Sequence, residues 1–134
     1  MLFQATFPAL KASSKRSGWS LSRERRPDIV LVHSFGDATR FLVLDAKWRS
    51  GRENVLDAMT SAHIYHDALR VRQVSPSSCL LLLPGKDTVS ELESEAFIHA
   101  HGVGAIKCVK IAGDGETRLV ELLKPWLSEP ISVA

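Results

Sequence analysis

Three charged side chains stand at the ends of two apolar stretches of strand length. Asp28 lies near the start of the run at residues 26–32, and Asp45 and Lys47 end the run at residues 41–47. Carboxylate oxygens are hard ligands that suit Mg²⁺ or Mn²⁺ rather than Zn²⁺. A lysine beside such an ion orients or deprotonates a water, or neutralises charge that develops on a phosphate. These residue types therefore indicate metal-assisted chemistry.

A turn-rich connector at residues 34–39 joins the two runs and predicts a β-hairpin. If Gly36 and Asp37 form a two-residue turn, residues whose numbers sum to 73 face one another, and Asp28 lies opposite Asp45. Lys47 shares their face because strand side chains alternate with a period of two. A longer loop would shift this pairing but would leave Asp45 and Lys47 on one face.

The predicted pairing brings two carboxylates together. Directly opposed side chains have Cβ atoms about 4.5–5.5 Å apart, so either one carboxylate is protonated or a cation lies between them. The simplest alternative is an ion pair between Asp45 and Lys47 at the edge of a sheet. The position of Asp28 favours the cation site.

Pro27-Asp28, followed by Asp45-Ala46-Lys47 at the end of the next strand, resembles the PD-(D/E)XK signature of restriction-endonuclease-like nucleases. The likeness extends over most of the chain to a bacterial group related to the nuclease subunit of McrBC-type restriction systems. It implies a Mg²⁺- or Mn²⁺-dependent DNA endonuclease of restriction or defence, with Asp28, Asp45 and Lys47 catalytic and Asp28, Asp45 and the Ala46 carbonyl as metal ligands. Further matching residues are Asp57, His63, Tyr65, Asp67, Ala68 and residues 102–106.

The chain departs from this family at one point. Its members usually carry a further acidic residue on a helix before the first strand, and Glu24 is the only acid upstream of Asp28. Glu24 is either an accessory ligand or a surface charge, and His63 and Tyr65 are either accessory site residues or a packed pair. The chain is then a fragment, a trimmed protein, or one whose partner subunit or further domain supplies the missing group. The departure keeps open a non-catalytic DNA-binding or assembly module of a larger restriction-type complex.

Positive charge is concentrated near the amino terminus. Residues 1–27 hold six basic residues and one acidic residue, although the whole chain carries a net charge of only +2. A basic segment that leads into an acidic site favours a polyphosphate substrate, and a solvated loop is the alternative. Candidate DNA contacts, each of which is otherwise a solvated charge, are Arg25, Arg26, Arg49 and Arg52.

Length and composition are those of one globular domain spanning residues 1–134. No apolar run is long enough to span a membrane, and a signal peptide is not evident, so we expect a cytoplasmic protein. Cys79 and Cys108 lie in separate apolar runs and predict buried free thiols. Many nucleases of the superfamily act as homodimers, which is a further expectation.

The remaining pattern predicts an α/β sandwich, a mixed sheet of about five strands flanked by helices. We expect strands at residues 2–7 and 18–22, the latter running straight into the Pro27 strand. A helix at residues 51–73 begins with a capping box formed by Ser50 and Glu53. A buried strand at residues 79–83 then runs parallel to the Asp45 strand. A short helix to about residue 100, a strand at residues 103–111 and a helix from Asp114 follow. The inward stripes are Val55, Met59, Ala62, Tyr65 and Leu69, then Leu119, Val120, Leu122, Leu123 and Trp126.

Overall fold

A computed structural model describes residues 2–3, 5–10, 18–48, 51–84, 89–107 and 114–128. The predictions for Arg49, Ser50 and Cys108 lie outside these residues. The strands are β1 (Leu2–Phe3), β2 (Gly18–Ser20), β3 (Ile29–Phe35), β4 (Ala38–Ala46), β5 (Leu69–Val71), β6 (Ser78–Leu83) and β7 (Val103–Lys107). The helices are α1 (Arg52–Ala68), α2 (Ser90–Glu93), α3 (Glu95–His101) and α4 (Asp114–Ser128). No helix in the described ranges is long and apolar enough to cross a membrane.

The α/β class and the mixed sheet are confirmed. In the described part of the chain, the main sheet has the order β1-β3-β4-β6-β7. β1, β3 and β4 are antiparallel neighbours, whereas β4, β6 and β7 run parallel. The predicted hairpin register is correct, because Ile29 pairs with Leu44 and Phe35 pairs with Ala38. The parallel crossover from β4 through α1 to β6 is also as predicted.

Helix α1 ends earlier than its sequence pattern predicts. Its last residue is Ala68, not Gln73, because residues 69–71 leave the helix and form β5. β5 pairs antiparallel with β2, and Gly18 lies opposite Val71, so β2 belongs to a separate two-stranded sheet and does not run on into β3. Gly51 is the N-cap of α1, and no side chain among the described residues caps this end of the helix. The predicted capping box depends on Ser50, which lies outside the described residues.

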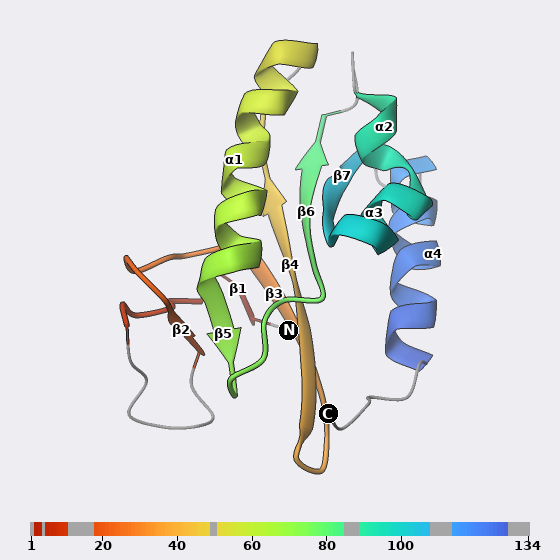
Figure 1. Ribbon diagram of the computed structural model, residues 1–134. Coiled ribbons are helices and arrows are strands. Elements are labelled where there is room, and N and C mark those ends of the chain that lie inside the picture. The colour runs from red at the N-terminus through yellow and green to blue at the C-terminus, as the bar shows by residue number, and fades with distance from the viewer. Residues whose placement is uncertain are drawn as a thin grey trace.

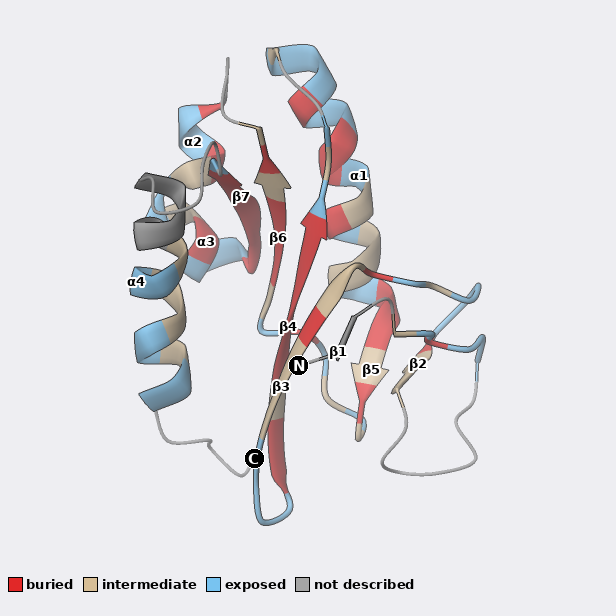
Figure 2. Ribbon diagram, turned by 180° about the vertical axis from the view of Figure 1, so that it is seen from behind, coloured by how far each residue is buried: buried red, intermediate tan, exposed pale blue. Residues whose placement is uncertain are grey.

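Each face of the main sheet buries its own apolar cluster, with α1 on one side and α4 on the other (Figure 1). Because side chains alternate along a strand, residues 41 and 43 face α1, whereas residues 42 and 44 face α4. Figure 2 shows β4 buried along most of its length. Cys79 is a buried free thiol, as predicted. Val120 is 42% exposed, so its predicted inward position is wrong; the α4 residues that pack inward are Leu119, Leu122, Leu123 and Trp126.

The helical segment before β7 is divided at Ser94. The Ser94 side chain accepts a hydrogen bond from the Phe97 amide at 3.3 Å and caps α3, so α2 and α3 are separate helices. β7 then passes close to them. A Cβ at Gly104 would lie 2.5 Å from Cγ1 of Ile98 and 2.6 Å from the Leu92 carbonyl oxygen. Glycine is required there by this close approach.

Candidate functional site

The carboxylates of Asp28 and Asp45 meet across the β3–β4 hairpin. One step beyond the Ile29–Leu44 pair, the ladder places Asp28 opposite Asp45. The Asp28 amide donates to Oδ1 of Asp45 at 3.4 Å, and the Ala46 amide donates to Oδ2 of Asp28 at 2.9 Å. Each carboxylate thus accepts from the backbone of the opposite strand. This exchange holds both acids on the face that α1 covers.

Lys47 completes the group. Its Nζ lies 2.8 Å from Oδ2 of Asp45 and forms an ion pair with it. The Asp45 side chain is 5% exposed and that of Lys47 is 30% exposed. Burial raises the pKa of Asp45, the Lys47 ammonium opposes this rise, and the Asp28 carboxylate adds to it. The fold therefore holds a carboxylate that water solvates poorly beside one cation.

Tyr65 of α1 lies over the same face and is half-buried against the cluster below α1. Burial, followed by the charges of Asp45 and Asp28, raises the pKa of Tyr65 to about 12. At neutral pH this phenol is protonated, so it can donate a hydrogen bond toward an anion near the acidic pair.

Arg25 reaches this region through a contact that is distant in sequence. Its amide donates to the Phe7 carbonyl at 3.0 Å, and its carbonyl accepts from the Phe7 amide at 2.8 Å. The two hydrogen bonds form an isolated antiparallel bridge. Opposed residues in such a bridge have side chains on one face, and the Phe7 ring packs on Phe41 in the cluster below α1. The Arg25 charge lowers the pKa of Tyr65. Nε of Arg25 is buried and has no hydrogen-bond partner among the described residues.

The other predicted site residues that the structure describes are exposed. His63 is exposed on α1. Glu24 forms an exposed ion pair with Arg26 at 3.6 Å. Arg52 pairs with Glu91 of α2 at 3.8 Å, also on the surface.

The donor set fits Mg²⁺ or Mn²⁺ bound with help from a substrate. Within the described ranges, no group of three or more His, Cys, Asp or Glu side chains could hold a metal ion. Mg²⁺, however, is commonly bound by one or two carboxylates together with substrate phosphates and water. Asp28 and Asp45 provide two carboxylates, and the buried Oδ2 of Asp45 is contacted by the Lys47 ammonium at 2.8 Å. The residues present therefore suit an ion that arrives with a phosphate.

A pocket of about 360 Å³ opens where the parallel strands β4 and β6 end. It is lined by Ala46, Lys47 and Trp48 from one strand end and by residues 82–84 from the other. Ligands of open α/β sheets bind in crevices outside the carboxyl ends of the strands. Trp48 is 91% exposed here. The motif pattern did not single it out, although its position directly after Lys47 was a usable signal.

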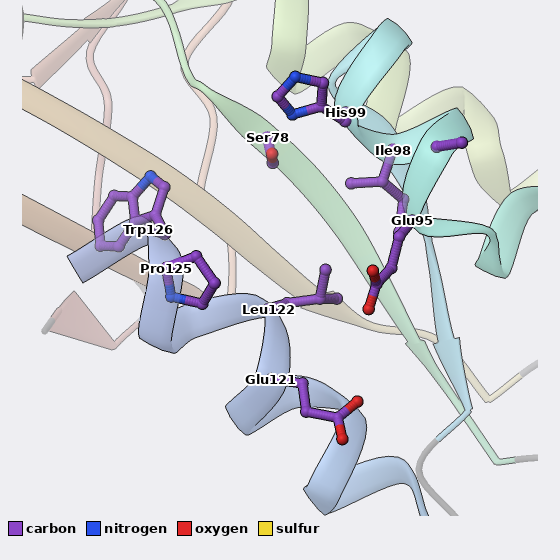
Figure 3. A pocket seen from close by; sticks show the side chains of 9 residues that line it. Ser78, Glu95, Ile98, His99, Glu121, Leu122, Pro125 and Trp126 are labelled. Atoms are coloured by element: carbon purple, nitrogen blue, oxygen red, sulfur yellow. The ribbon is translucent and has the colours of Figure 1, made fainter. Parts of the chain in front are cut away.

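A second pocket, of about 420 Å³, lies between α3 and α4 (Figure 3). Trp126, Leu122 and Ile98 form apolar parts of its wall, and the carboxylates of Glu95 and Glu121 line it as well. Two carboxylates oppose the approach of a phosphodiester. Of the two pockets, the one beside Lys47 is therefore the better candidate for a nucleic acid.

Comparisons of the chain with protein-family models, with curated proteins and with solved structures return no match. The functional argument therefore depends on the geometry of the site and on the sequence motif.

Proposed function

We propose that this protein is a metal-dependent endonuclease that hydrolyses DNA phosphodiester bonds. The observation that carries the proposal is the pair Asp28 and Asp45, opposed across a hairpin, with the Lys47 ammonium 2.8 Å from Asp45. Structural ion pairs rarely include a second carboxylate opposite the first, because its repulsion makes the arrangement unfavourable. Sites that keep such a pair commonly use it for chemistry.

In this proposal each residue has a distinct role. Asp28 and Asp45, with the Ala46 carbonyl, hold Mg²⁺ or Mn²⁺, which when bound supplies Lewis-acid chemistry and a more acidic water. Lys47 orients the attacking water or donates to the phosphoryl oxygen on which charge develops. Arg25, which its bridge with Phe7 places on the face of the acidic pair, contacts a phosphate of the substrate through its guanidinium.

The restriction-endonuclease-like fold and a role in bacterial restriction or defence belong to the same proposal. They are supported by the PD and D-x-K residues on adjacent strands and by the helix that follows and crosses to a parallel strand. The order hairpin, helix, parallel strand is the one that the family resemblance leads us to expect.

The test is cleavage of supercoiled plasmid in Mg²⁺, Mn²⁺ or EDTA. We expect metal-dependent nicking by the wild type, and a loss of at least about 100-fold in Asp45→Asn and Lys47→Ala. Asp37→Asn is the matched control, because Asp37 is exposed at the tip of the same hairpin. Thermal melting shows whether each variant is folded. Robust nicking by folded Asp45→Asn would refute the proposal.

A second candidate is a non-catalytic DNA-binding module of a larger complex. It is favoured by the lack, among the described residues, of a third metal-ligating side chain beside the acidic pair. In this case the wild type retains DNA in a gel shift but leaves the plasmid intact in every metal. The same samples therefore distinguish the two candidates.

A further inference from the structure

Trp48 is exposed to an extent that is unusual for tryptophan. At 91%, it has the largest exposed fraction among the large hydrophobic side chains that the structure describes as exposed. A single exposed tryptophan does not by itself make a protein-protein patch. Its immediate neighbours are a half-buried cation, Lys47, and the exposed Ala46. An aromatic face beside a cation is instead the combination that binds single-stranded nucleic acid.

The pocket beside Trp48 gives this surface a shape. Leu82, Leu83 and Pro84 form its apolar part, and Lys47 and Trp48 line the other side. Its volume of about 360 Å³ lies within the range of small-molecule sites. Because Lys47 and Trp48 line the same pocket, a nucleotide with its phosphate at Lys47 is able to place its base against the indole.

We propose that Trp48 stacks on an unpaired base of the substrate, so that the preferred substrate is DNA with a single-stranded segment at the site of cleavage. This inference rests on the proposed nuclease function. In a duplex both faces of a base are covered by its neighbours, so an indole gains access only where the base is unpaired or flipped out.

The test measures DNA binding in EDTA, where no metal-dependent cleavage occurs. Fluorescence anisotropy follows a labelled oligothymidylate, which forms no self-pairs, and a blunt duplex of equal length. We expect tighter binding of the single strand by the wild type. Stacking energies predict that Trp48→Ala raises its Kd about five- to 150-fold, whereas Trp48→Phe retains most of the affinity.

Phe35→Ala is the matched control, since Phe35 is 81% exposed at the far end of the same hairpin. It should bind as the wild type does, and neither exposed substitution should change the thermal midpoint. The Trp48→Ala effect should persist at high salt, which weakens phosphate contacts but not stacking. Preference for the duplex, or a Trp48→Ala Kd within twofold of wild type, overturns the inference.

This outcome is separable from that of the nuclease assay. If the wild type nicks plasmid and Trp48→Ala binds single strands normally, the nuclease proposal stands and the stacking role is rejected. If the wild type cleaves no DNA but Trp48→Ala loses single-strand binding, the nuclease proposal is rejected and the stacking site stands. A partner protein on Trp48 would leave both DNA measurements unchanged in Trp48→Ala.

Discussion

Replacing Lys47 by methionine removes the ammonium but keeps an unbranched side chain. At 2.8 Å and an effective dielectric constant of about 20, the attraction between Nζ and Oδ2 of Asp45 is about 6 kcal/mol. Desolvation of both ions cancels much of this value, which leaves a net coupling on the order of 1–3 kcal/mol. Asp45 is only 4% exposed and also faces Asp28, so removal of the Lys47 ammonium should destabilise the folded state. We expect Lys47→Met to lower the free energy of unfolding by about 2–4 kcal/mol at neutral pH.

The measurement is a double-mutant cycle by urea denaturation, using wild type, Lys47→Met, Asp45→Asn and the double variant. Asp45→Asn should cost little, because Lys47 reaches water and repulsion between the acids is relieved. The pKa of Asp45 is already raised and rises further without Lys47. A raised pKa means that the folded state favours the protonated acid, so the Lys47→Met deficit should shrink as pH falls through that pKa.

Two results would refute this reasoning. One is additivity of the single substitutions within about 0.5 kcal/mol, and the other is a Lys47→Met deficit that stays constant as pH is lowered. Arg52→Met is the matched control, because its ion pair with Glu91 is exposed on both sides. It should change stability by less than about 1 kcal/mol.

Further predictions concern residues around the site and the packing behind it. Tyr65 is the only tyrosine, so ultraviolet titration of phenolate should show one transition near pH 12. Asp45→Asn should lower the midpoint of this transition by removing a negative charge. A wild-type midpoint near the ordinary value of about 10 contradicts the placement of Tyr65. Gly104→Ala should destabilise the fold by about 1–3 kcal/mol in urea, because its Cβ has no room. Gly36→Ala meets open space but has a positive φ of 60°, so it should cost about 1–2 kcal/mol. A Gly104→Ala variant as stable as the wild type would argue against the close approach at Gly104.

The part of the site built on the hairpin could be predicted from the sequence. Alternation along both runs and a two-residue turn at Gly36 and Asp37 determine the register, and the register determines that Asp28 meets Asp45. The continuous apolar run of β6 likewise predicted a strand buried on both faces. These features depend on residues that are close together in the chain, and a sequence pattern is sufficient to predict them.

The features that could not be predicted depend on contacts between distant segments. Residues 69–71 continue the helical pattern of α1, but pairing with β2 outweighs that local preference. Arg25 reaches the site only because Phe7 forms a bridge with it. No spacing rule in the sequence connects residue 7 with residue 25, or residue 18 with residue 71.

The pairing of β2 with β5 also has a consequence for the order in which the site assembles. Asp28 and Asp45 are 17 residues apart, and β-hairpins close within about 1–10 μs. Strand β2, which precedes Arg25 in the chain, is fixed only after Gly18 has found Val71, and such distant closures are slower because the entropy of a longer loop is lost first. During synthesis from the ribosome, the two acids can therefore meet once residue 47 has emerged, whereas β2 can pair only after residue 71 has emerged.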